Sequence, residues 1–213
     1  MPGTVNQRDL PQILDQSLLL HDGIAPLWDG FPSIHSRRAI ASLGFCSIVR
    51  HHTNSQLVLA QQGLDLSATT LVRPAFEALV RAVWCAAGAD EAWIERFLSP
   101  PQDSLQIGET AMSPSVQRML DQLRPHHPAR IHDELARLRT LTWLAMHSYV
   151  HGGIHAFIHS LSGPHEHECA GVVINANGML ITATHLARMN AGLTSAQIPL
   201  LQRRYASCLP PSS

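Results

Sequence analysis

The chain has 213 residues, of which 45% are hydrophobic and only 15% are charged, and its formal net charge is −1 at pH 7. This length suffices for one sizeable core, and no Pro-, Gly- or Ser-rich stretch in the middle is long enough to link two independent domains. The net charge excludes a global positive field of the kind that drives non-specific nucleic-acid binding, so any contact with nucleic acid must be local.

The first predicted elements are helices at the N-terminal side. Residues 9–20 carry leucine and isoleucine at near-helical spacing, and residues 22–36 read as a loop held by aromatic side chains, so residues 1–36 form an N-terminal helix and loop. Residues 36–62 form a long helix that ends at Gly63. Ile40 and Ile48 are among its expected inward positions.

The next stretch, residues 65–88, is the most apolar of the chain and contains Pro74. Proline removes one backbone donor and clashes with the preceding turn, so the choice is between a kinked helix and a helix that starts at Pro74. The apolar pattern extends across the proline, which favours the kinked helix. Residues 99–128 hold a weak helical run bounded by prolines and are predicted to be a mobile insertion.

The C-terminal half continues the helical pattern. Residues 129–160 are periodic, residues 161–169 form a polar loop, and residues 171–207 contain two helical runs broken near Gly192. Only residues 171–174 could form a strand, and a lone strand has no partner. The sequence therefore predicts an all-α fold, a single-domain helical bundle of six or seven helices over residues 1–213.

Neither the start of the chain nor its cysteines indicate export. The first nine residues contain no apolar segment typical of a secretory signal, and no stretch approaches 18 uninterrupted apolar residues, so we expect a cytoplasmic protein that does not span a membrane. The cysteines form no Cys-x-x-Cys pair and should be reduced thiols, with Cys46 and Cys85 in the core. We expect no cofactor.

Four histidines recur every four residues in one predicted helix, namely His147, His151, His155 and His159. At 3.6 residues per turn such a spacing places neighbouring members one above the other on a single face. Two imidazoles so placed can hold a metal ion, or can donate and accept protons on either side of one reacting group. They can also serve packing or an interface only.

Two further observations bear on this stripe of histidines. Gly152 and Gly153 interrupt it, and each glycine costs roughly 1 kcal/mol in a helix interior, which usually means that another helix, a dimer partner or a ligand approaches the backbone. The metal interpretation lacks its usual carboxylates, because no His-Glu-x-x-His motif occurs and only Glu166 and Glu168 in the following loop could supply oxygens.

A second polar pattern lies in the most apolar helix, where Arg73, Glu77 and Arg81 are spaced four residues apart. Buried charge is costly unless it is paired, and a carboxylate between two guanidinium groups is a self-contained way of pairing it. The alternative is that Arg73 or Arg81 faces the histidine helix and offers its guanidinium to an anion, most naturally a phosphate. Arg137 and Arg139, which precede His147 by two to three turns, could join the same surface.

The segment Arg73-Pro74-Ala75-Phe76-Glu77, followed some seventy residues later by Tyr149-Val150-His151-Gly152-Gly153, resembles a set of uncharacterised bacterial all-helical proteins. More distantly, residues 37–190 resemble the HEPN superfamily. The resemblance implies a helical bundle, often a homodimer, in toxin or phage-defence settings, and some HEPN members cut RNA without metal. Their active site pairs an arginine with a histidine four to six residues away, whereas Arg139 and His147 have seven residues between them.

Three functions compete on these residues. As a metal-independent ribonuclease, the protein would use His147 or His151 to take a proton from a ribose 2′-hydroxyl, with Arg73 or Arg139 stabilising the phosphate and Glu77 holding the arginine. As a non-enzymatic module, it would dimerise or bind a small anionic ligand in a helical cleft. As a histidine-rich bundle, it would bind a metal ion whose identity the sequence leaves open.

Overall fold

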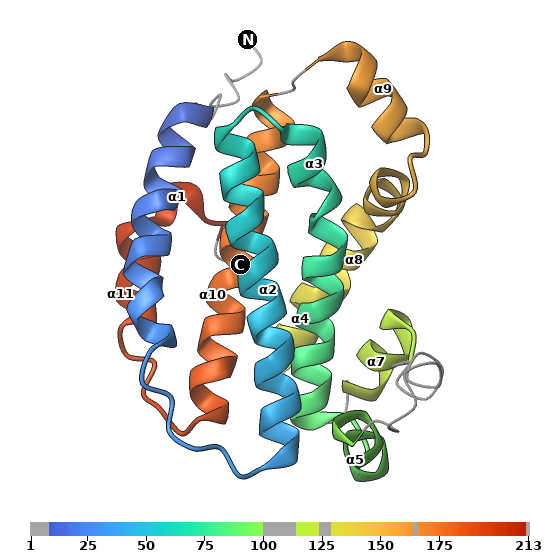
Figure 1. The fold of residues 1–213 in the computed structure, drawn as a ribbon. Helices are drawn as coiled ribbons and strands as arrows, with labels where there is room; N and C mark the ends of the chain where they lie inside the picture. The colour runs from blue at the N-terminus through green and yellow to red at the C-terminus, as the bar shows by residue number, and fades with distance from the viewer. Residues whose placement is uncertain (1–8, 100–113, 124–128, 164–165, 212–213) are drawn as a thin grey trace.

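The computed structural model describes residues 9–99, 114–123, 129–163 and 166–211, and within these ranges the elements are helices joined by turns and loops, with no strand (Figure 1). The α-helices are α1 (Leu10–Ile24), α2 (Arg37–Gln61), α3 (Asp65–Thr70), α4 (Val72–Ala87), α5 (Glu91–Leu98), α7 (Val116–Leu123), α8 (Ala129–Val150), α9 (Ile154–Ser162), α10 (Glu166–Asn190) and α11 (Ile198–Arg204), with short 3₁₀ helices η1 (Ala25–Trp28) and η2 (Ala206–Cys208). The all-α class is confirmed. The described part holds ten α-helices rather than six or seven. Turns divide the two helices predicted over residues 65–88 and 129–160, and short helices lie beside them in the chain.

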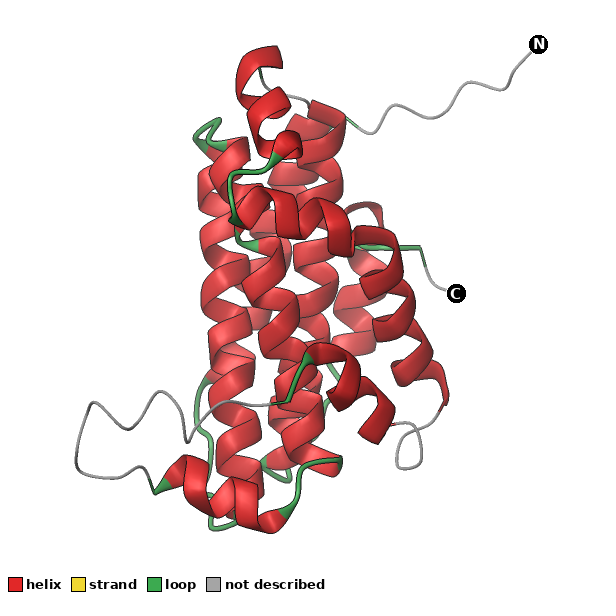
Figure 2. Cartoon of the chain, turned by 90° about the vertical axis from the view of Figure 1, so that its right-hand side faces the viewer, coloured by secondary structure: helices red, strands yellow, loops and turns green. Residues whose placement is uncertain are grey.

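The centre of the bundle is formed by α2, α4 and α10, and α1 lies along α10 (Figure 1). The flank with α7, α8 and α9, on the right in Figure 1, faces the viewer in Figure 2. Ten of the sixteen residues of α4 are buried, so this helix has core on several sides. Its largest buried side chain, Trp84, packs edge-to-face against Trp93 of α5 with 4.7 Å between ring centroids, a geometry that aromatic pairs prefer.

Helix α2 begins and ends as its sequence predicts, but two of its predicted inward positions face outward. The hydroxyl of Ser36 accepts a hydrogen bond from the backbone N–H of Ala39, and Gly63 adopts a left-handed φ of +69° after the last turn. Ile40 and Ile48 are 41% and 42% exposed, so their expected inward positions were wrong. Small and polar side chains face the core instead, because α2 packs directly against both α4 and α10.

The apolar stretch around Pro74 is two helices rather than one kinked helix. The chain breaks at Leu71, which separates α3 from α4, and Pro74 lies in the first turn of α4. The first backbone N–H groups of a helix have no partner within it, so a proline there sacrifices no hydrogen bond. The expected kink was therefore wrong, and the proline stands at a helix start.

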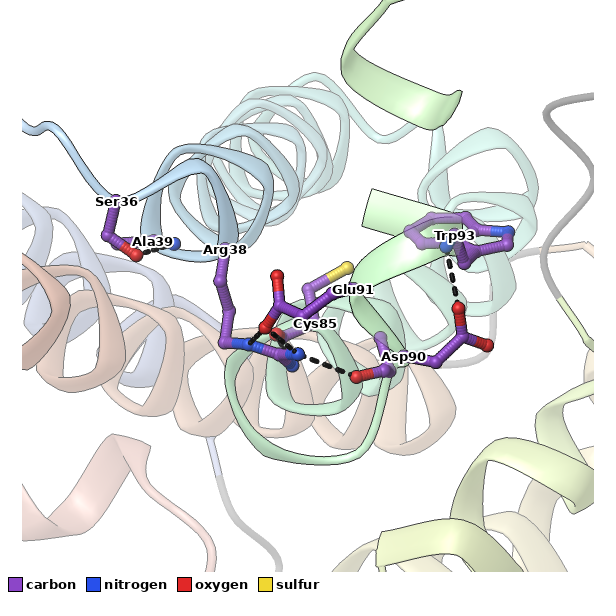
Figure 3. Close-up of polar contacts among 8 residues, drawn as sticks. Ser36, Arg38, Ala39, Cys85, Asp90, Glu91 and Trp93 are labelled. Atoms are coloured by element: carbon purple, nitrogen blue, oxygen red, sulfur yellow. Dashed lines mark hydrogen bonds and ion pairs between the residues drawn. The ribbon is translucent and has the colours of Figure 1, made fainter. Parts of the chain in front are cut away.

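A single arginine joins three helices at the lower end of the bundle (Figure 3). Arg38 of α2 donates hydrogen bonds to the backbone carbonyls of Cys85 and Ala89, at 2.9 and 2.7 Å, and forms an ion pair with Glu91 of α5. The last carbonyls of α4 have no partner within the helix, and a guanidinium satisfies them while it complements the helix dipole. Arg38 thus fixes the turn between α4 and α5.

The predicted insertion falls mainly on residues 100–113 and 124–128, which lie outside the described residues. Between them, α7 packs on α4: Met119, Leu120 and Leu123 are buried, and the indole N–H of Trp84 donates to the side-chain oxygen of Gln122 at 2.8 Å.

Helix α10 is long and apolar enough, by length and composition, to resemble a membrane span. Its most apolar 18-residue window is 61% buried within the bundle, which is what the core helix of a soluble protein also shows, so the resemblance is weak evidence. Residues 171–174, the one candidate strand, lie inside this helix.

All four cysteines are buried and free. Cys46 and Cys85 lie in the core as predicted, and burial raises the pKa of each thiol to about 12. Because the thiolate is the reactive form, these two side chains act as small packing groups.

A partly buried imidazole should make the fold sensitive to acid. His21 of α1 donates a hydrogen bond from Nε2 to the side-chain oxygen of Asn177, 3.0 Å away, and burial lowers the pKa of His21, an effect that this hydrogen bond only partly offsets. The folded chain therefore holds His21 neutral, while the unfolded chain binds a proton near pH 6.5, so the stabilisation is present above that pH and is lost as the pH falls below it.

We expect His21→Gln to lose less stability than the wild type between pH 7.5 and pH 5.0. Urea unfolding of both proteins at the two pH values measures this difference. Because the pKa of His52 is also lowered, the comparison between the two proteins, rather than the loss in either one, isolates His21. An equal loss in both would contradict the assignment.

Candidate functional site

Three charged side chains of α4 form an ion-paired row along one face of the helix. The Arg73 Nε lies 2.8 Å from one carboxylate oxygen of Glu77, and the Arg81 Nη1 lies 3.4 Å from the other. Four residues are a little more than one turn, so the three side chains stand one above the other. Their side chains are 19% to 26% exposed. The predicted pairing of Glu77 with both arginines is present, and the row carries one net positive charge.

The end of α8 and the turn that follows it bring two imidazoles to this row. Arg73 Nη1 lies 2.5 Å from Nδ1 of His147 and 3.5 Å from Nε2 of His151, and the two rings are 4.4 Å apart. A guanidinium only donates hydrogen bonds, so each of these ring nitrogens accepts one, and the other nitrogen of each ring carries the proton. Four side chains therefore lie together, although 74 residues separate Arg73 from His147. We call them the Arg73 cluster: Arg73, Glu77, His147 and His151.

The Arg73 cluster lies on an open face of the molecule. His147 and His151 are exposed, and Arg73 and Glu77 are partly buried beneath them. No residue of the cluster lines the cavity of about 630 Å³ that lies between α8, α10 and α11. A reacting group can therefore approach the imidazoles from solvent without entering a pocket, which suits a segment of a polymer better than an enclosed small molecule.

Arg139 is the fifth residue that the sequence singled out. It lies on α8 eight residues before His147, which corresponds to a rise of about 12 Å along the helix. The hydrogen bonds and ion pairs given above join the other four candidates. Arg139 therefore lies about two helical turns from the cluster rather than at its centre.

The four-histidine stripe does not exist as one helical face, because α8 ends at Val150 and α9 begins at Ile154. Gly152 has a left-handed φ of +63°, and a Cβ on Gly153 would lie 2.7 Å from the Ser148 hydroxyl. The two glycines are therefore needed by the turn itself, and the close approach comes from the preceding helix. The prediction of a single face was wrong for His155 and His159, which lie on the other side of this turn.

His159 belongs to a second polar network that the sequence did not indicate. Its Nε2–H donates to a carboxylate oxygen of Asp65 at 2.7 Å, and its Nδ1 accepts from the Tyr149 hydroxyl at 3.0 Å. A carboxylate oxygen of Glu168 lies 3.7 Å from the same Nδ1. His159 is only 4% exposed, so this network joins α9 to the start of α3, the end of α8 and the start of α10.

The chemistry of this network favours a structural role. Burial, together with the charges of Glu168 and Asp65, raises the pKa of Tyr149, which keeps the phenol protonated and opposes its use as a nucleophile. No local spacing could have revealed the network, since Asp65 and His159 are 94 residues apart. Its effect is to hold α9, and with it the turn that carries His151, against the bundle.

Metal binding receives no support from the described residues. Within them, no group of three or more His, Cys, Asp or Glu side chains is arranged to hold a metal ion. In the Arg73 cluster a guanidinium, rather than a carboxylate, stands next to both imidazoles.

Comparison with known proteins gives one match. The model of a family described as a family of unknown function (DUF6988) matches residues 46–211. No curated protein and no solved structure matches the chain. The expected kinship with an uncharacterised family is thereby confirmed, whereas a bacterial origin and the likeness to the HEPN superfamily stay predictions.

Proposed function

We propose that this chain, which belongs to the DUF6988 family, is a metal-independent ribonuclease. The proposal rests on the geometry of its Arg73 cluster. The observation that carries the proposal is the guanidinium of Arg73, which contacts the imidazoles of His147, on α8, and of His151, in the turn after α8, while Glu77 holds it in place. Two imidazoles beside a cation are the groups that transfer of a phosphodiester needs, namely a base, an acid and a partner for the phosphate charge.

The reaction follows from these groups. When substrate binds, the guanidinium of Arg73 turns from the imidazoles to the phosphate, which frees the lone pair of each ring. One imidazole then accepts the proton of a ribose 2′-hydroxyl, and the 2′-oxygen forms a bond to the adjacent phosphorus. The bond between phosphorus and the 5′-oxygen breaks, and the other imidazole, in its protonated form, donates a proton to that leaving oxygen. The products are a 2′,3′-cyclic phosphate and a 5′-hydroxyl, and Arg73 stabilises the negative charge that grows on the phosphate oxygens.

RNA is favoured as the substrate by the surroundings of the cluster. The chain as a whole has a net charge of −1, so it lacks a general field for polyanions. The row of Arg73, Glu77 and Arg81 supplies a local positive charge beside the exposed imidazoles. An open, locally positive surface accepts an extended strand, and the sequence resemblance to HEPN proteins, some of which cut RNA without metal, points to the same chemistry and to a toxin or phage-defence setting.

The test is cleavage of a labelled single-stranded RNA in the presence of EDTA. We expect the purified protein to cut the RNA and to leave a DNA strand of the same sequence intact, because DNA lacks the 2′-hydroxyl that attacks the phosphate. Gel electrophoresis of both strands over time measures this. Intact RNA, or equal cutting of DNA, would contradict the proposed reaction.

A second candidate function, self-association, is favoured by one specific observation on α9. Four large apolar side chains of this nine-residue helix are more than half exposed, at 62% for Ile154, 58% for Phe157, 51% for Ile158 and 71% for Leu161. Exposed apolar patches of this kind mark interaction surfaces, and the same patch on two copies can form a self-complementary two-fold interface. Because α9 follows the turn that carries His151, a second copy there would border the Arg73 cluster.

We expect the wild type to be a homodimer and the double substitution Phe157→Ser with Leu161→Ser to be a monomer. Light scattering at protein concentrations of tens of micromolar measures the mass of each. Leu200→Ser on α11 removes a side chain that is 57% exposed but far along the chain from α9, so it serves as the matched control and should stay dimeric. A monomeric wild type would exclude self-association through α9.

A further inference from the structure

A cavity of about 630 Å³ lies between α8, α10, α11 and the C-terminal segment, away from the Arg73 cluster. Its volume is within the range of small-molecule sites, which is roughly 300 to 1,000 Å³. Four helices and the chain end contribute to its wall, so side chains of distant parts of the sequence converge on it.

The floor of this cavity is apolar. Leu79 of α4, Leu135 of α8 and Met179 of α10 line it, and these side chains are only 2%, 5% and 3% exposed. The cavity therefore reaches the hydrophobic core rather than being a shallow surface depression. Contact with such a floor favours a hydrocarbon chain or ring, because burial of apolar surface is favourable by about 25 cal/mol per Å².

The polar groups of the cavity suit an anion. Two arginines from different helices, Arg137 of α8 and Arg203 of α11, line it, and no carboxylate occurs among the described residues of the lining. Both side chains are exposed and form no ion pair within the described residues, so their guanidinium groups are available at the mouth. Asn175 lines the same space and can add a hydrogen-bond donor.

The C-terminal segment closes one side of the cavity through a close contact with α10. Pro210 lies so near Gly178 that a Cβ at this position would be 2.8 Å from the proline ring. Glycine is therefore required for this part of the wall to approach α10. The cavity is thus a built feature of the fold, which depends on the contact between a glycine in the middle of a core helix and the chain end.

We propose that this cavity binds a small amphipathic organic anion, with its apolar body on the core-facing floor and its carboxylate or phosphate between Arg137 and Arg203. This site is separate from the Arg73 cluster, and it holds whether or not the protein cleaves RNA. Charge complementarity selects the anion, because the cavity offers two guanidinium groups and no described carboxylate. The apolar floor selects an amphipathic ligand over inorganic phosphate.

Titration calorimetry with dodecanoate, below the concentration at which it forms micelles, tests the proposal. We expect saturable one-to-one binding to the wild-type protein, and dodecyl phosphate should bind at the same site. Inorganic phosphate and dodecyltrimethylammonium should not bind, since the first lacks the apolar body and the second reverses the charge. The double substitution Arg137→Gln with Arg203→Gln should weaken dodecanoate at least about tenfold, because two charge-assisted hydrogen bonds are lost.

Matched variants separate the cavity from other apolar surfaces. Arg204→Gln changes the neighbouring arginine, whose guanidinium lies over the ring of Tyr205, and should leave the affinity unchanged. Leu161→Ser on α9 should also leave it unchanged, whereas Ala206→Phe should abolish binding by filling the mouth. The proposal is overturned by an absence of saturable binding, by equal affinity in the double arginine variant, or by loss of binding in Leu161→Ser.

Discussion

Replacement of both His147 and His151 by alanine should reduce the rate of RNA cleavage at least about a thousandfold, to the level of the buffer. General acid and general base catalysis each contribute a factor of roughly 10² to 10⁴, and the double variant removes both groups at once. The two imidazoles are exposed, so their loss should leave the fold intact. Initial rates on a labelled RNA in EDTA, with circular dichroism melting curves of both proteins, give the comparison.

His155→Ala is the matched control for this experiment. His155 is an exposed histidine of the same stretch, but it lies on α9, beyond the turn at Gly152. Among the described residues, its side chain makes no contact with the Arg73 cluster. We expect it to cleave RNA at the wild-type rate. Activity that survives in the double variant, or that falls equally in His155→Ala, would remove His147 and His151 from the reaction.

The largest expected effect on stability comes from a single buried amide. Asn177 of α10 is 0% exposed, and its side-chain nitrogen donates to the Ser17 hydroxyl and to the Cys208 carbonyl, each at 2.8 Å, while its oxygen accepts from His21. One side chain thereby connects α10 to α1 and to the C-terminal segment. Its removal leaves several buried polar groups without partners, and each such group costs about 1 to 3 kcal/mol.

We therefore expect Asn177→Ala to lower the free energy of unfolding by about 3 kcal/mol or more, as urea denaturation at pH 7.5 measures it. Asn177→Leu, which restores volume but no hydrogen bond, should not recover this loss. The control is Asn175→Ala on the same helix, where a partly buried side chain should change the free energy by about 0.5 kcal/mol or less. A loss below 1 kcal/mol in Asn177→Ala would show that water replaces these hydrogen bonds.

The parts of the fold that could be predicted are those that local chemistry determines. Ser36 and Gly63 bound α2, and Gly192, with a φ of +68°, separates α10 from α11, because capping and left-handed conformation depend on single residues. Ile40 and Ile48 show the limit of periodicity. Which face of α2 is buried depends on the helices beside it, and two close neighbours select small side chains over large ones.

The candidate site divides in the same way. The pairing of Arg73 with Glu77 follows from four-residue spacing on one helix and could be predicted. Spacing alone gave a wrong result for His155 and His159, because Gly152 and Gly153 end the helix that the spacing assumes. The contacts between α4 and α8, and the bond between Asp65 and His159, join residues that are far apart in the chain, so only packing could reveal them.

The end groups of the cleaved RNA test the ribonuclease account most directly. Mass spectrometry should find a 2′,3′-cyclic phosphate on one product and a 5′-hydroxyl on the other, formed in EDTA. An oligonucleotide with a single 2′-deoxy residue should resist cutting at that position alone. Products that carry a 5′-phosphate and a 3′-hydroxyl, or cutting at the 2′-deoxy position, would contradict proton transfer by His147 and His151 beside Arg73.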